Sequence, residues 1–218
     1  MGVSDFVLLL HATWQTIEMV FVAIVFSVVA GLPLGVLLFA TRNRQLFHKP
    51  ALHSACGMVV NVFRSVPFII LLVAITPLTR LIVGTSIGTT AAMVPLAISA
   101  IPFFARLVES AISEVPVGLI EAAMAMGASP LQIVWKVLIP EARASIVRAV
   151  TLTLITLVGY SAMAGAIGGG GLGNLAIMYG YERFEIRIMF MTVVVLILMV
   201  QLFQWCGDKC AKKLAHNI

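Results

Sequence analysis

Long apolar runs separated by short polar segments dominate the pattern of this chain. A membrane-spanning helix needs about 20 predominantly apolar residues. Runs of roughly this length predict five transmembrane helices, over residues 19–40, 54–78, 89–105, 149–167 and 188–206. The second run reaches this length only if it includes Arg64. The pattern therefore predicts an all-α integral membrane protein.

The polar segment between the third and fourth runs, residues 106–148, carries a first short amphipathic helix. Pro116 suits the first turn of a helix, and Gly127 suits a left-handed turn that ends one. Between them, one face carries residues at i, i+3, i+4 and i+7: Leu119, Ala122, Ala123 and Met126. Because two of these are alanines, we expect this helix to lie close to another backbone.

A second short helix follows directly. Ser129 is a suitable N-cap, Pro130 a suitable first residue, and Gln132 stands where a capping box needs it. We predict that Pro140 breaks this helix. The two helices are then expected to lie along the membrane surface as a helix–turn–helix.

Composition agrees with a membrane protein. Hydrophobic residues make up 61% of the 218 residues and charged residues only 11%, whereas soluble domains carry about 25% charged residues. The formal charge of +5 does not indicate nucleic-acid binding, because no basic stripe with interleaved aromatic residues is present.

The distribution of basic residues predicts the orientation in the membrane. With five spans, one side receives Arg42, Arg44, Lys49, Arg106, Lys136, Arg143, Arg148, Lys209, Lys212 and Lys213. The other side receives only Arg80, Arg183 and Arg187. Since cytoplasmic loops carry the excess of Lys and Arg, we predict an outside N-terminus and a cytoplasmic C-terminus.

No catalytic or cofactor chemistry is indicated. Gly168, Gly170 and Gly173 fit a dinucleotide-binding pattern, but they follow a membrane helix rather than a strand. The chain has no phosphate-binding loop of the Walker type. Neither the histidines nor the cysteines have the spacing of a metal site. The histidines are dispersed along the chain, at His11, His48, His53 and His216. We therefore expect no catalytic residue, metal or cofactor in this chain, and no enzyme.

The segment 106–148 resembles a family signature. Glu121, Ala122 and Ala123 are followed by Gly127 and, nine residues later, by the run Val137-Leu138-Ile139-Pro140. The permeases of binding-protein-dependent (type I) ABC importers carry this pattern, with Ile and Leu where this chain has Val137 and Ile139. Three runs also look like the methionine importer permeases of that family: NVFRSVPFIILLV, LITLVGYSAMAGAIGGGGLGN and GLIEAAMAMGASPLQIVWKVLIPEA.

The resemblance implies an architecture. It covers about residues 13–204 as the core of a single transmembrane permease domain, 1–218, with a cytoplasmic coupling loop at 115–142. In that family the loop docks on a separate ATPase, which holds the ATP and Mg²⁺. The expected coupling residues are Glu121, Ala122, Ala123, Met126, Gly127, Pro130, Lys136 and Pro140.

The resemblance also implies partners and a location. We expect a permease homodimer in the bacterial inner membrane lipid, with two ATPase subunits inside. A periplasmic or lipid-anchored binding protein is expected outside. The implied function is methionine uptake by alternating access, driven by the ATPase.

Pathway residues are a further expectation. A charge at membrane depth usually faces a cavity or a partner, so Arg64 is a candidate for attracting a substrate carboxylate. It is equally a candidate for snorkelling or for pairing within the fold. The full set of pathway or gate candidates is Arg64, Ser65, Pro67, Tyr160, Ser161 and Met163. Ordinary packing is the alternative for Met163. An outer glycine loop is expected at Gly168, Gly170, Gly171 and Gly173.

Other functions stay open from sequence alone. A secondary transporter or channel is one alternative, although such folds often contain inverted repeats and intramembrane carboxylates, which this sequence lacks. The other alternative is an ABC permease for another amino acid or a small peptide.

Overall fold

The computed structural model describes residues 3–42 and 46–215, and these contain helices and no strands. Arg44 and His216 lie outside the described residues. The helices are α1 (Val3–Arg42), α2 (Pro50–Ser65), α3 (Phe68–Ala74), α4 (Thr76–Val83), α5 (Thr89–Ser113), α6 (Val117–Ala125), α7 (Pro130–Ile133), α8 (Ile139–Ala166), α9 (Gly171–Leu175) and α10 (Ile186–Ala215). Two π-helical segments interrupt them, η1 (Val134–Leu138) and η2 (Ala176–Tyr181).

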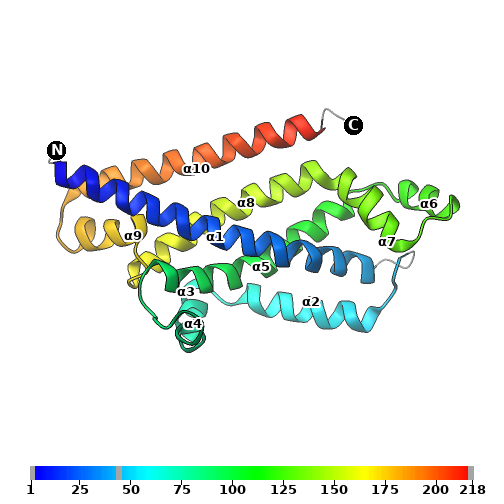
Figure 1. The fold of residues 1–218 in the computed structure, drawn as a ribbon, viewed down its shortest axis with the longest axis horizontal. Helices are drawn as coiled ribbons and strands as arrows, with labels where there is room; N and C mark the ends of the chain where they lie inside the picture. The colour runs from blue at the N-terminus through cyan, green and yellow to red at the C-terminus, as the bar shows by residue number, and fades with distance from the viewer. Residues whose placement is uncertain (1–2, 43–45, 216–218) are drawn as a thin grey trace.

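The long helices lie side by side along the long axis of the molecule (Figure 1). The N-terminus and α9 lie toward one end, whereas α6 and α7 lie at the other, and the C-terminus lies on the same half of the molecule as α6 and α7. Four helices are long and apolar enough to cross a membrane, and the bent pair α2–α3 raises the number to five if it counts as one span. The all-helical membrane architecture predicted from the sequence is therefore confirmed.

Close contact between α1 and α5 organises the core. Ser27 on α1 donates a hydrogen bond to the carbonyl of Ala100 on α5 (3.0 Å). A Cβ placed on Gly35 would lie 2.5 Å from the carbonyl oxygen of Ala105. Only glycine allows the two backbones to approach this closely.

Apolar side chains fill two regions on either side of this contact. One region includes Met19, Leu96, Leu157 and Leu172. The other includes Phe104, Ile112, Ile120, Ile133 and Leu138, and it joins α5 to the segment 115–142.

The second predicted span is not one continuous helix. α2 ends at Ser65, and the chain bends by 100° before α3 begins at Phe68. Val66 is extended (φ −84°, ψ 125°), as a residue before proline prefers. The predicted second span over 54–78 therefore consists of separate helices, because Pro67 ends α2.

The predicted break at Pro140 is also absent. The helix is continuous from Pro130 to Ala166, and it passes through η1, where the Ile139 N–H bonds to the Val134 carbonyl five residues back. Proline ordinarily clashes with the carbonyl four residues before it, and the wider π turn relieves this contact. The second helix of the segment 115–142, α7, therefore continues through η1 directly into α8.

Most other helices extend beyond the apolar runs that predicted them. α1 begins well before residue 19, and α5 continues to Ser113 rather than ending near residue 105. An apolar run detects only the part of a helix that lies in hydrocarbon. Polar turns at the helix ends, such as that around Glu109, are not detected by a search for apolar runs.

Candidate functional site

The turn between α6 and α7 has the geometry that its sequence predicts. The Gly127 N–H bonds to the Met124 carbonyl (2.9 Å), and the Ala128 N–H bonds to the Ala123 carbonyl (3.0 Å). Gly127 is left-handed, with φ of 79°. This pair of bonds is a Schellman motif, which confirms Gly127 as the residue that ends the helix.

The start of α7 is a complete capping box. The backbone N–H of Ser129 donates to Oε1 of Gln132 (2.9 Å), and the N–H of Gln132 donates to Oγ of Ser129 (3.4 Å). Pro130 follows as the first helical residue. The two caps fix the angle between α6 and α7 through local bonds.

Burial divides the residues of the segment 115–142 into two groups. Ile120 and Ala123 are buried against Ile133 and Leu138. The expected coupling residues Glu121, Ala122, Gly127, Lys136 and Pro140 are exposed, and Pro130 is half-buried. Of the predicted face, only Ala123 packs inward; Leu119, Ala122 and Met126 face outward.

The exposed side of this loop includes large apolar side chains. Met126 is 83% exposed, and Leu131 and Trp135 are each 61% exposed. These three side chains, which we call the loop face, lie on the segment in the same half of the molecule as the C-terminus (Figure 1). Exposed apolar side chains of this size are available for contact with another molecule.

Two of the predicted pathway residues lie together. Arg64 at the end of α2 and Tyr160 on α8 line one cavity of about 190 Å³. We call it the Arg64 cavity, and its lining residues are Phe63, Arg64, Val66, Phe68, Ser99, Phe103 and Tyr160. The Phe68 and Tyr160 rings stack, with their centroids 4.5 Å apart.

The other pathway candidates lie apart from this cavity. Ser65 and Pro67 are exposed at the bend, and Ser65 donates to the Asn61 carbonyl (2.8 Å). Ser161 is buried and donates to the Val158 carbonyl within its own helix (2.8 Å). Met163 is 46% exposed near the end of α8.

Sequence reasoning missed Phe68, Ser99 and Phe103 as lining residues of this cavity. No local motif marks Ser99 and Phe103, because they meet Arg64 only when α5 packs beside the bend. The spacing of Ser99 and Phe103 by four residues places them on one face of α5. That helical spacing is the only signal from which they could have been found.

A second, larger cavity of about 660 Å³ adjoins the same bend. Its lining includes His53, Asn61, Ser65, Val66 and Arg106, so Val66 is shared with the Arg64 cavity. Arg106 forms an ion pair with the buried Glu109 (2.6 Å) and donates to Oδ1 of Asn61 (2.9 Å). The Arg106–Glu109 spacing of three residues could have indicated this pair from the sequence.

The glycine loop is held to α1 and to the start of α5 by hydrogen bonds. The Gly171 N–H donates to Oε1 of Gln15 (2.9 Å), and the Leu172 N–H donates to Oγ1 of Thr16 (2.9 Å). The Gly88 N–H donates to the carbonyl of Gly168 (3.0 Å). Gly168, Gly170 and Gly171 are left-handed, whereas Gly173 is helical and packs tightly against Ala162.

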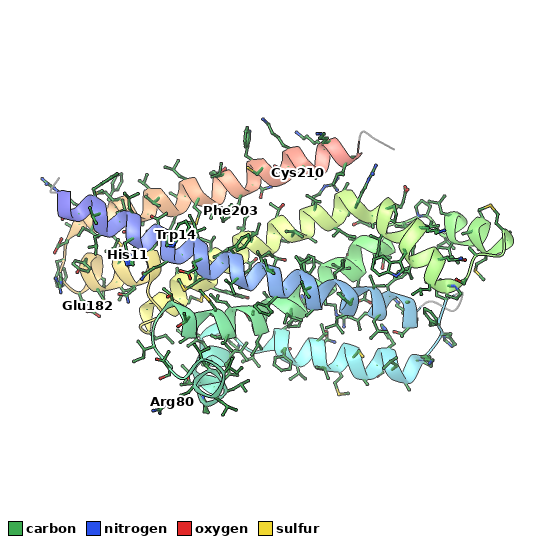
Figure 2. The ribbon with its side chains drawn as sticks, in the orientation of Figure 1. His11, Trp14, Arg80, Glu182, Phe203 and Cys210 are labelled. Carbon is green, nitrogen blue, oxygen red and sulfur yellow. The ribbon has the colours of Figure 1, made fainter. Side chains whose placement is uncertain are left out.

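Gly168, Gly170 and Gly171 border a cavity of about 380 Å³, together with His11 and Tyr179. Figure 2 shows His11 and Glu182 near this end of the molecule.

Comparison with known proteins identifies relatives over nearly the full chain. The family described as "Binding-protein-dependent transport system inner membrane component" matches residues 23–215. A Vibrio cholerae protein named "Probable D-methionine transport system permease protein MetI" is 58% identical over 210 residues, which is 96% of this chain and 93% of that protein. The Escherichia coli K12 "D-methionine transport system permease protein MetI" is 58% identical over 158 residues, or 72% and 73% of the two chains.

Solved structures agree with these relatives. A structure of the MetNI methionine ABC transporter in an inward-facing conformation matches with a TM-score of 0.96 and 51% identity, over 98% of this chain and 99% of that chain. An amino acid ABC transporter matches with a TM-score of 0.80 at 20% identity, over 97% and 96% of the chains, and shares the fold. The relatives are multi-pass membrane components of transporters rather than enzymes. This chain belongs to the family of inner membrane components of binding-protein-dependent transport systems.

Proposed function

We propose that this chain is the membrane-spanning permease subunit of an ATP-driven methionine importer. The observation that carries the proposal is the 58% identity to the Vibrio cholerae D-methionine permease over 96% of this chain. The structural match to the MetNI methionine transporter at 51% identity supports the same substrate.

The proposed topology has five spans, with the bent pair α2–α3 as the second. The N-terminus lies outside and the C-terminus lies in the cytoplasm of a bacterial cell. Two observations support this orientation. The termini lie at opposite ends of the long helices (Figure 1), and Lys209, Lys212 and Lys213 lie at the C-terminal end, as cytoplasmic segments require.

The segment 115–142 is the proposed docking site of a separate ATPase subunit. The exposed Met126, Leu131 and Trp135 of the loop face support this role. The ATP and Mg²⁺ belong to that partner. A substrate-binding protein, periplasmic or lipid-anchored, is the proposed partner at the opposite end, and the family's printed description supports it.

Two copies of the permease and two ATPase subunits make up the proposed complex. Alternating access follows if ATP favours one of two conformations of the dimer over the other. In this scheme the Arg64 cavity belongs to the pathway, and the glycine loop belongs to the outer gate.

The test is reconstitution of this chain with its ATPase and binding protein in proteoliposomes. We expect ATP-dependent uptake of radiolabelled methionine that excess unlabelled methionine suppresses, and no uptake when a non-hydrolysable ATP analogue replaces ATP. Uptake of a different amino acid would contradict the proposed substrate. Failure of the ATPase to co-purify with the permease would contradict the proposed coupling.

A further inference from the structure

Arg64 has no hydrogen-bond or ion-pair partner among the residues that the structure describes. The other arginine near the bend is in the opposite situation, because Arg106 is bonded to Glu109 and to Asn61. A guanidinium presents five N–H donors in a planar fork that matches a carboxylate. The donors of Arg64 are therefore available to an anionic ligand in the cavity that they border.

Aromatic rings form most of the remaining wall. Phe63, Phe68, Phe103 and Tyr160 line the cavity with Arg64, and the stack of Phe68 on Tyr160 holds two of these rings in place. Aromatic faces attract cations, and they make favourable contacts with thioether sulfur. A guanidinium beside such rings suits a ligand with a carboxylate, a cationic group and an apolar side chain.

Besides the guanidinium, two hydroxyl-bearing side chains line the cavity, Ser99 and Tyr160, and Ser99 is the small one. It donates to the Leu96 carbonyl (2.9 Å), so its oxygen lone pairs can accept a hydrogen bond from an ammonium group. The cavity of about 190 Å³ is smaller than the roughly 300–1,000 Å³ of pockets for drug-sized ligands. This size favours a single amino acid over a peptide.

The position of Ser99 along α5 agrees with a cavity inside the proposed membrane span rather than at its end. Ser99 is ten residues after the start of α5, which is about 15 Å at the helical rise of about 1.5 Å per residue. The hydrocarbon core is about 30 Å thick. A small polar ligand at this depth lies on the way across the membrane rather than at either surface.

We propose that the Arg64 cavity binds the transported amino acid inside the permease. The Arg64 guanidinium pairs with the α-carboxylate, the Ser99 oxygen and an aromatic face receive the ammonium group, and the thioether side chain lies among the rings. This inference rests on the proposed function for the identity of the substrate. It adds a recognition step within the membrane to any selection made by the binding protein.

Photo-crosslinking tests the location directly. The reconstituted complex of permease and ATPase, without binding protein, is illuminated with a diazirine analogue of methionine, and the labelled peptides are identified by mass spectrometry. We expect labels within residues 63–68 or 99–103, or at Tyr160, and we expect excess methionine to remove them. Labelling of the permease only elsewhere, or labelling that methionine does not compete, would overturn the proposal.

Arginine variants test the chemistry. Arg64→Ala should reduce labelling roughly 10- to 100-fold, as loss of a hydrogen-bonded charged partner implies, and Arg64→Lys should restore part of it because the charge remains. Arg80→Ala is the matched control, since Arg80 is exposed on α4, away from the coupling loop (Figure 2). Equal labelling of the Arg64→Ala and Arg80→Ala complexes would overturn the role of Arg64.

Uptake measurements separate this inference from the proposed function. With binding protein present, the Arg64→Ala complex should lose most methionine uptake, whereas the Arg80→Ala complex should keep it. Wild-type transport of methionine together with full transport by Arg64→Ala would overturn the inference and leave the importer function standing. Absence of methionine uptake by the wild-type complex would instead overturn the proposed function, on which the identity of the ligand depends.

Discussion

The rings of Phe68 and Tyr160 lie 4.5 Å apart, centroid to centroid, with planes only 1° from parallel. This contact joins the first residue of α3, just beyond the bend, to the C-terminal part of α8. Such aromatic pairs contribute about 0.5–1.5 kcal/mol beyond the area they bury. The contact therefore links the position of the bend to the position of α8.

Tyr160→Ala should weaken this link, whereas Tyr160→Phe should preserve it. We expect the alanine variant to lower the melting temperature of the purified complex and to slow uptake, because the stack and its buried area are lost. The phenylalanine variant keeps the ring and should behave like the wild type in both assays. A phenylalanine variant as impaired as the alanine variant would assign the role to the hydroxyl instead.

Gly127 gives a second prediction. Its left-handed φ of 79° costs an L-residue about 1–2 kcal/mol, although a Cβ there would meet no atom within 4 Å. Gly127→Val should therefore distort the turn between α6 and α7 and reduce co-purification of the ATPase and coupled uptake. The measurement is the ATPase-to-permease ratio after affinity purification.

Gly118→Ala is the control for this experiment. Gly118 lies on α6 in the same loop, its Cβ would also meet no atom within 4 Å, and its φ is not left-handed. Alanine favours helix there by up to about 1 kcal/mol, so ATPase binding should be retained. Equal loss in both variants would show that any added side chain on this surface blocks docking.

Gly35→Ala should destabilise the permease without touching either partner surface. Its Cβ would lie 2.5 Å from the Ala105 carbonyl oxygen and 2.7 Å from Cβ of Val108. α1 must then move away from α5, and overpacking of this kind costs about 1–3 kcal/mol. Gly57→Ala is the control, because its Cβ would have its nearest contact at 3.5 Å. A thermal-unfolding experiment in detergent that shows equal stability for both variants would contradict this reading of the contact.

The Arg106–Glu109 pair gives a prediction about the interaction energy between these two side chains. Glu109 is only 5% exposed, so Glu109→Gln leaves Arg106 without its charged partner in a partly buried position. We expect Glu109→Gln and Arg106→Gln each to lower stability, and the double variant to lower it by less than the sum. A double-mutant cycle of melting curves should give a coupling energy of about 0.5–3 kcal/mol. Strict additivity would mean that the ion pair contributes nothing to the fold.

The features that the sequence predicted correctly depend on neighbours in the chain. The capping box of Ser129 and Gln132 and the turn at Gly127 are set by residues within five positions of each other. Pro67 ended a helix as prolines commonly do, yet Pro140 did not, because η1 widens the turn before it. The residues next to Pro67 and Pro140 do not indicate which of the two prolines ends a helix.

The Arg64 cavity could be predicted only in part for a related reason. Arg64 and Tyr160 were identified separately, by a charge in an apolar run and by a polar ring late in one. Phe103 resembles any apolar residue on α5, and only packing of three helices around the bend gives it a role. Residues from different helices come together in this way only through the contacts of all the helices, and no local sequence pattern indicates it.

The course of α8 beyond Pro140 has a geometric consequence for the aromatic stack. Tyr160 is 20 residues after Pro140 on one continuous helix, which places it about 30 Å further along at about 1.5 Å per residue. A deflection of about 20° at the proline, the threshold of a sharp kink, would displace Tyr160 sideways by roughly 10 Å. That displacement exceeds the 4.5 Å between the Tyr160 and Phe68 rings. The direction in which the helix leaves Pro140 therefore decides whether the two rings meet at all.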